Sequence, residues 1–212
     1  MKNRLMNHKL TNGLTNNKSV YLLILFSLIS LLFLTLLSYK IVLFLTPLTD
    51  SQQKTIDFLY ENTNYNQNYN NQFDLRYTSD EYSHLIDVKS VMKSIDVIFY
   101  LSMLVFTSII TLTRRNSLLQ RKMFKIAGTA VVSILLLFVF LSIFAFNDLF
   151  TLFHQIFFPQ GNWIFANDSL LITTFPIEFF IQIARNIFIL SLISGTFLIS
   201  LSFLKKSEKN DY

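Results

Sequence analysis

Four long apolar segments alternate with polar connections along the 212 residues of this chain. The segments cover about residues 20–46, 94–113, 125–147 and 179–204. A helix needs roughly 20 consecutive apolar residues to cross the hydrocarbon core of a bilayer. The pattern therefore predicts an all-α membrane protein, with four transmembrane helices in a single integral membrane domain, residues 1–212.

The first apolar segment follows a basic start, so a cleaved signal peptide is the rival interpretation. Its apolar run is longer than the 7–15 residues of a signal-peptide core, and no small-residue cleavage site follows it. We therefore expect it to remain as the first transmembrane helix. Between the first two segments, residues 61–73 form an Asn-rich tract. The second long helix is expected to start at Ser79 or Asp80 as its N-cap.

The placement of the charges predicts the orientation. The net charge of +5 could suggest nucleic acid. However, residues 1–19, 113–125 and 205–212 hold four, five and three basic residues. Residues 47–94 hold seven acids against four basic residues, and residues 147–180 hold three acids and no basic residue.

Because cytoplasmic connections carry the excess of Lys and Arg, both termini are predicted to be cytoplasmic. The loops after the first and third helices, about residues 47–93 and 148–178, would then form an extracellular cap. We expect a multi-pass protein of the plasma membrane, in contact with membrane lipid and without a nucleic-acid partner.

Two of the three histidines, His84 and His154, fall on the same outer side in this topology. Each comes a few helical turns away from an apolar segment. A histidine with its ordinary pKa of about 6.5 can take and return a proton near neutral pH. Both are candidate catalytic residues, and the alternative is that each only forms a loop hydrogen bond or anchors at the headgroups. Asp87, three residues after His84, could orient its ring or form an ordinary surface pair.

Further candidates flank the fourth segment. Glu178 and Arg185 lie on one polar stripe at its start, where they could pair and either serve the site or fix helix packing. Asn162 and Trp163 could be an interfacial anchor, but an Asn amide beside a histidine could also donate to a developing oxyanion. The remaining candidates for supporting or binding substrate are Tyr82 and Asp168.

The chain has no cysteine, no G-x-S-x-G elbow, no H-E-x-x-H and no Gly-rich phosphate loop. These absences argue against a common serine hydrolase and against a zincin. Two histidines with a carboxylate could still bind zinc, but their spacing matches no short zinc pattern. We expect neither a metal nor a cofactor.

Three stretches resemble the bacterial lipoprotein intramolecular transacylases: EYSHLIDVKSVM (81–92), FHQIFFPQGNWIFANDSLL (153–171) and FPIEFF (175–180). The resemblance implies a four-helix membrane bundle with an outer cap. It implies an acyltransferase that moves the sn-2 acyl chain of a diacylglyceryl-modified lipoprotein to the α-amino group of its N-terminal cysteine, which gives the lyso-form. The family histidines implicated in catalysis map onto His84 and His154.

Two other functions remain open from the sequence. One is a metal-dependent membrane lipid hydrolase, and the other is a non-enzymatic transport or accessory protein with the Glu178–Arg185 stripe along a path across the bilayer. Against the second, the polar groups gather at one depth of the membrane.

Overall fold

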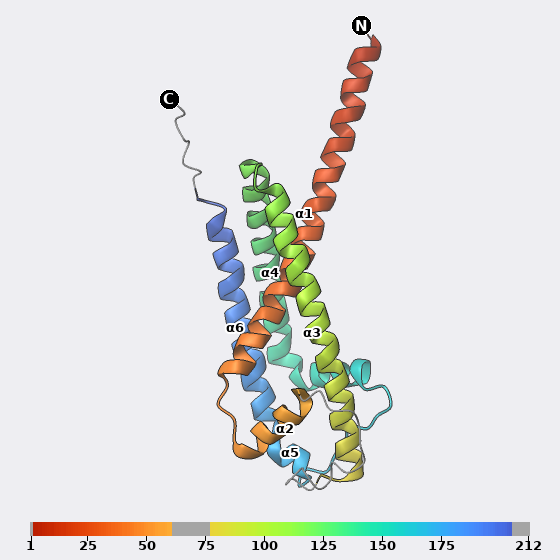
Figure 1. Cartoon of the computed structure of the whole chain (residues 1–212), viewed down its shortest axis with the longest axis vertical. Helices are drawn as coiled ribbons and strands as arrows, with labels where there is room; N and C mark the ends of the chain where they lie inside the picture. Colours follow the sequence, from red (N-terminus) through yellow and green to blue (C-terminus); the bar gives the residue numbers. More distant parts are fainter. Residues whose placement is uncertain (1, 61–76, 205–212) are drawn as a thin grey trace. The chain divides into compact units, whose positions relative to one another are not determined.

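The structure, a computed structural model, describes residues 2–60 and 77–204, with side chains at residue 17 and from residue 19 onward. The Asn-rich tract at 61–73 and the basic tail at 205–212 lie outside these residues. Every regular element in the described ranges is an α-helix, which confirms the predicted class. The helices are α1 (Lys2–Leu45), α2 (Asp50–Tyr60), α3 (Ser79–Thr113), α4 (Ser117–Phe157), α5 (Leu170–Thr174) and α6 (Ile177–Leu201) (Figure 1).

Four of these helices are long and apolar enough to cross a membrane: α1 from Ser19 onward, α3, α4 and α6. Their number agrees with the four apolar segments. α3 and α4 have 35 and 41 residues, more than the roughly 20 that a bilayer core requires. Both therefore continue well beyond their apolar parts, and these extensions carry the two histidines.

The start of α3 corrects the expected cap. The helix begins at Ser79, so its N-cap is Thr78 rather than Ser79 or Asp80. Glu81 Oε2 accepts a hydrogen bond from the Thr78 backbone N–H at 2.8 Å, and the Glu81 N–H donates back to Thr78 Oγ1 at 3.3 Å. This is a capping box, in which two groups at the helix start satisfy each other. Its T-x-x-E pattern is present in the sequence.

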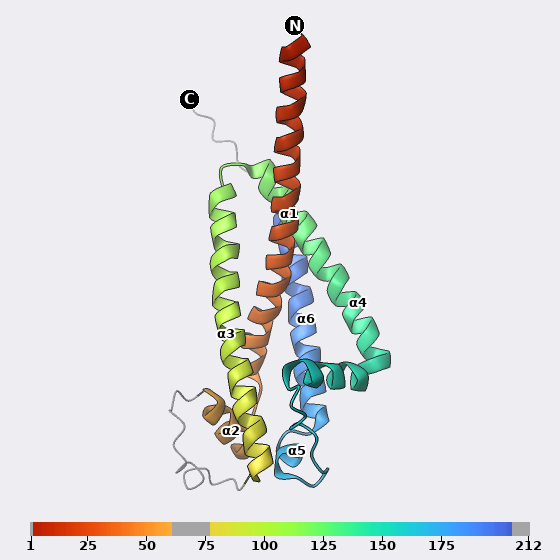
Figure 2. The ribbon, with the colours of Figure 1, turned by 90° about the vertical axis from the view of Figure 1, so that its right-hand side faces the viewer.

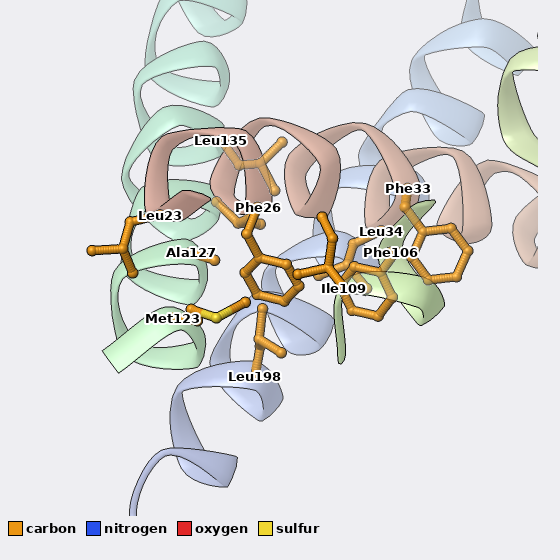
Figure 3. Packing of buried hydrophobic residues seen from close by; sticks show 11 residues of the cluster. Leu23, Phe26, Phe33, Leu34, Phe106, Ile109, Met123, Ala127, Leu135 and Leu198 are labelled. Carbon is orange, nitrogen blue, oxygen red and sulfur yellow. The ribbon is translucent and has the colours of Figure 1, made fainter. Parts of the chain in front are cut away.

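The chain forms two compact units. The first contains residues 1–38, 99–137 and 188–212, and its core is built from aromatic and aliphatic side chains (Figure 3). The rings of Phe26 and Phe106 lie 5.3 Å apart, and those of Phe33 and Phe106 lie 4.9 Å apart. Within this unit the backbones of α4 and α6 approach closely, because a Cβ atom at Gly128 would lie 2.7 Å from the Gly195 carbonyl oxygen.

The second unit contains residues 39–98 and 138–187 and holds every candidate catalytic residue. Its core includes Phe58, Leu85 and Phe175. Two long-range hydrogen bonds attach the short helix α2: Gln52 Nε2 donates to the Thr174 carbonyl at 2.9 Å, and Lys89 Nζ donates to the Phe58 carbonyl at 2.7 Å. The first attaches α2 to the end of α5, and the second attaches it to α3.

Within this second unit, α4 bends. Ala145 has non-helical backbone angles, φ −137° and ψ 34°. Figure 2 shows that the last part of α4, which ends at Phe157, runs in a different direction from the part before the bend. The bend falls two residues before the expected end of the third apolar segment at 147. His154 therefore lies in the helical segment after the bend, and not in a loop as the sequence suggested.

Candidate active site

His84 lies in the second turn of α3 and is almost completely buried, with 7% of its surface exposed. Aromatic rings enclose it. The centroid of its ring is 4.7 Å from that of Phe158 and 5.7 Å from that of Phe165, both in edge-on arrangements. Burial of this kind disfavours the charged imidazolium, because a charge would lose its hydration. The surroundings of His84 therefore favour a neutral ring.

His154 lies in the last turn of α4, and its Nδ1 is 2.8 Å from the Phe150 carbonyl oxygen. A carbonyl oxygen only accepts hydrogen bonds, so this contact requires the proton on Nδ1. In the neutral ring, Nε2 then keeps a free lone pair. The indole of Trp163 packs beside the imidazole, with 4.9 Å between ring centroids. His154 is thus fixed in the form that can accept a proton at Nε2.

The structure brings the two histidines together although 70 positions separate them in the sequence. Their ring centroids are 6.2 Å apart and their planes are 23° from parallel. Phe158 contacts both rings, at 4.7 Å from His84 and 5.6 Å from His154. Phe158 is itself buried, at 3% exposure. We call this group of two histidines with Phe158, Phe165 and Trp163 the histidine site.

Asp87 does not bond directly to His84 in the described structure, where its carboxylate holds the loop after α4. Its Oδ2 accepts from Gln160 Nε2 at 2.6 Å and from Asn162 Nδ2 at 2.7 Å. Asn162 Nδ2 also lies 3.4 Å from Ser83 Oγ. Among the described residues, no direct hydrogen bond supports the expectation that Asp87 orients the His84 ring. Asp87 acts on the loop that covers His84.

Gly161 makes this double contact possible. It separates the two amide residues and has φ +80°, in the left-handed region that side chains with a Cβ disfavour. Its N–H donates to the Phe158 carbonyl at 3.1 Å, which closes a tight turn at the end of α4. The turn directs the side chains of Gln160 and Asn162 to the same carboxylate. The sequence shows the glycine, but it does not show that the amides on either side of it bond to Asp87.

Two buried polar atoms of the site have no hydrogen-bond partner among the described residues. They are Nδ1 of His84 and Oδ1 of Asn162. Buried polar atoms in folded proteins are nearly always paired, so an unpaired one is a feature to explain. The two residues are nonetheless neighbours: burial is the main cause that lowers the pKa of His84, and the Asn162 side chain opposes it as a hydrogen-bond partner of the ring.

Glu81 is a buried carboxylate that sequence reasoning missed. It is 1% exposed, and its Oε1 accepts from the Leu171 backbone N–H at 2.8 Å, while Oε2 accepts from the Thr78 N–H and hydroxyl. It thereby connects the start of α3 with the start of α5. The loop between α4 and α5 is consequently fastened at two points, Asp87 and Glu81. The T-x-x-E pattern was the available signal for this residue.

The other predicted supporting residues lie in different surroundings. Tyr82 packs in the core of the second unit, with its ring 5.6 Å from that of Phe58. Asp168, Glu178 and Arg185 are exposed. The expected Glu178–Arg185 pair is wrong, since the single salt bridge within the described residues joins Lys40 and Asp96. Seven residues along a helix correspond to about 10 Å, which is too far for a direct pair on one straight helix.

Of the described residues, no group of three or more His, Asp or Glu side chains has the arrangement to hold a metal ion. The candidate site therefore consists of two imidazoles, a ring of aromatic side chains and a set of amides fixed by Asp87. Such groups can move protons and position a substrate.

Four membrane-length helices and two adjacent histidines, one buried and one half-buried, in an aromatic enclosure point to an integral membrane enzyme. The model of one protein family, described as lipoprotein intramolecular transacylase Lit, matches residues 16–180. The chain belongs to this family of membrane acyltransferases.

Solved structures agree with this assignment at the level of the fold. The structure of the membrane-integral lipoprotein intramolecular transacylase Lit from Bacillus cereus superposes with a TM-score of 0.72 at 17% identity, covering 88% of this chain and 94% of that one. A form of the same enzyme with one histidine substituted by arginine gives a TM-score of 0.70 at 15% identity, with 92% and 95% covered. A search of curated proteins gave no match.

Proposed function

We propose that this protein moves the sn-2 acyl chain of a diacylglyceryl-modified lipoprotein to the α-amino group of its N-terminal cysteine and leaves the lyso-form. The observation that carries the proposal is the pair His84 and His154, 6.2 Å apart within an aromatic enclosure. Membership of the transacylase family supports the reaction class. The chemistry requires a proton acceptor for the amine and a proton donor for the leaving oxygen, and two histidines supply both.

His154 is the better candidate for the base. Its Nδ1–H donates to the Phe150 carbonyl, so its Nε2 lone pair is available in the neutral ring. In the proposed reaction the amine nitrogen attacks the sn-2 ester carbon, and a C–N bond forms while His154 takes one proton from the amine. The C–O bond to glycerol then breaks. The proton that His154 took passes to the ring of His84, which then protonates the leaving glycerol oxygen, so both imidazoles end neutral, as they began.

The aromatic enclosure favours transfer over hydrolysis. The ester and the amine belong to one molecule, so holding them together replaces an encounter by a step within a single complex. Phe158, Phe165 and Trp163 place apolar surface beside the imidazoles, and such surface offers a competing water no hydrogen-bond partner. The acyl chain itself is apolar and suits the same surroundings.

The proposed cellular arrangement follows from the charges. Both termini would be cytoplasmic and the loops after α1 and α4 would form an extracellular cap, because the basic residues gather in the opposite connections. The histidine site would then face the side where lipoproteins are displayed. The substrate would approach the histidine site from within the membrane, because its two acyl chains remain in the bilayer.

The test is the form of the lipoprotein made by cells that carry this protein or its variants. Mass spectrometry of the N-terminal peptide locates the acyl chains on the glycerol or on the amine. His84→Ala and His154→Ala should each abolish the lyso-form, whereas His8→Ala, the matched control at the third histidine, should retain it. Full conversion by both variants at the site would refute the proposed roles. Free fatty acid with stoichiometric zinc would instead identify a metal-dependent hydrolase.

A further inference from the structure

The Asn162 side chain is held in one orientation by the start of α3. Its Nδ2 donates to Asp87 Oδ2 at 2.7 Å and lies 3.4 Å from Ser83 Oγ. A carboxylate only accepts hydrogen bonds, so turning the amide round would place Oδ1 against a negatively charged oxygen. The amide nitrogen must therefore face Asp87. Oδ1 is left as a buried acceptor with a fixed direction.

This acceptor belongs to an immediate neighbour of His84. Ser83 and Asp87, which contact the amide nitrogen, come directly before His84 and three residues after it on α3. Burial lowers the pKa of His84 and the nearby His154 lowers it further, whereas Asp87 and the Asn162 side chain, as a hydrogen-bond partner, raise it. A partner that raises the pKa of an imidazole accepts from the protonated ring. In Asn162 only Oδ1 can do so, because Nδ2 is a donor.

Nδ1 is the ring nitrogen of His84 that is fully enclosed. Within the described residues it has no other hydrogen-bond partner, and neither has Asn162 Oδ1. The first atom can carry a proton and the second only accepts one. Leaving either of them unpaired would destabilise the fold. Two such atoms on neighbouring side chains complement each other.

We propose that Asp87, Asn162 and His84 form a relay, in which Nδ1–H of His84 donates to Asn162 Oδ1 and Asn162 Nδ2 donates to Asp87. Asn162 is then a positioning residue, which acts on the reaction through His84 alone. Asp87 orients the His84 ring, as the sequence suggested, but through an amide of the loop after α4. The inference rests on the proposed function, since it assigns the proton positions of that site.

The relay gives the two histidines the same tautomer. The Nδ1–H of His154 donates to the Phe150 carbonyl, so each ring holds its Nδ1 proton on an acceptor of the protein. The lone pair of each neutral ring is then on Nε2. In the proposed transfer, the proton taken by His154 arrives at Nε2 of His84 and leaves from the same atom to the glycerol oxygen. No proton moves through Nδ1, and the Asn162 amide keeps its orientation throughout.

The tautomer of His84 can be measured directly and without turnover. Nitrogen-15 NMR of the full-length protein, labelled at histidine in detergent micelles, shows which ring nitrogen carries the proton, and His8→Gln and His154→Gln assign the three signals. Wild-type His84 should carry its proton on Nδ1. Asn162→Leu should move the proton to Nε2 in a large share of the molecules, because Nδ1 has lost its acceptor. Asn167→Leu, at an exposed residue of the same loop, should match the wild type.

Exchanging the two polar groups tests the connection through Asn162. In the double variant Asp87→Asn with Asn162→Asp, the amide at position 87 can donate to the carboxylate at position 162, which still accepts from His84. Contact with this charge should raise the pKa of His84 from about 4 by roughly one to three units. Asn162→Asp alone places two carboxylates together, so it should convert an ester-linked lipopeptide more slowly than the double variant.

The same assay separates positioning from substrate binding. Asn162→Leu should lower kcat by at least about tenfold with little change of KM, since a catalytic histidine in the wrong tautomer can lose about 10⁴-fold in kcat. Asn167→Leu should keep both values.

A wild-type His84 with its proton on Nε2 would overturn the inference. So would an unchanged tautomer in both Asn162→Leu and Asn162→Ala, where the smaller variant guards against a folding defect of the larger one, or a double variant whose His84 keeps the wild-type pKa. Failure of the proposed function is a separate result, since it would show as an absence of lyso-form from the wild type while the NMR signals remain as expected.

Discussion

The Glu81 carboxylate accepts a hydrogen bond from the backbone N–H of Leu171, 90 residues further along the chain, at 2.8 Å. Burial alone would make a carboxylate costly at this position, but the Thr78 N–H and hydroxyl also donate to it. The capping residue of one helix thus also fixes the first residues of α5. Because Glu81 is one turn from His84, the same contact determines how the loop lies over the histidine site.

Replacing Glu81 by Ala should destabilise the protein by about 2 kcal/mol, since three donors lose a charged acceptor. The measurement is reversible unfolding in mixed micelles with increasing SDS. Transfer activity should fall as well, because the loop with Asn162 is no longer fastened near α5. Glu178→Ala removes an exposed carboxylate and provides the control. Equal stability of the two variants would contradict the role given to Glu81.

Gly161 should tolerate substitution in a predictable order. Its φ of +80° strains any residue with a Cβ, and the space around it is open, with no atom within 4 Å of an added Cβ. Asn adopts this conformation more readily than Ala, and a β-branched residue does so least. Transfer rates should therefore fall in the order Gly, Asn, Ala, Val. A Val variant as active as the Asn variant would show that the turn does not position the loop amides.

The close approach of α4 and α6 predicts a packing defect. At Gly128 a Cβ would lie 2.7 Å from the Gly195 carbonyl and 2.9 Å from the Ile199 nitrogen, both backbone atoms that cannot move aside alone. Gly128→Ala should destabilise the first unit by about 1–3 kcal/mol, the usual cost of overpacking. The same unfolding assay measures it. Helix propensity alone would make this variant more stable by about 1 kcal/mol, so any loss of stability reports the overpacking.

The predicted orientation can be measured without background, because the chain has no cysteine. Cysteine introduced at Asn167 should react with a membrane-impermeant maleimide added to intact cells. Cysteine introduced at Arg115, in the basic connection between α3 and α4, should react only after the membrane is opened. The reverse pattern would place the histidine site on the cytoplasmic side.

The four helices could be predicted from the sequence because they depend on local composition. A run of apolar residues long enough for a bilayer specifies a helix with little help from the rest of the chain. The sequence could also predict that His84 and His154 lie near each other, since the predicted topology places both on the same side of the membrane. Their separation and the identity of the aromatic residues between them depend on how the chain folds back.

The contacts of Asp87 and Glu81 could not be deduced in this way. The sequence offered His84 as the natural partner of Asp87, three residues away on one helix. In the structure the carboxylate bonds instead to Gln160 and Asn162, more than 70 positions further on. Long-range hydrogen bonds of this kind follow from the path of a loop. No local pattern specifies them. The T-x-x-E sequence could have indicated the capping role of Glu81, but the cap was expected at Ser79 or Asp80.

The bend at Ala145 has a consequence for the depth of the reaction. A residue with non-helical angles interrupts the ladder of backbone hydrogen bonds, and hydrocarbon offers no substitute partner for the groups released. We therefore expect the bend to lie where water or headgroups begin on that side of the membrane. His154, nine residues later, then works at the boundary between two solvents. A polar peptide terminus and an acyl ester can both reach that level without either leaving its preferred medium.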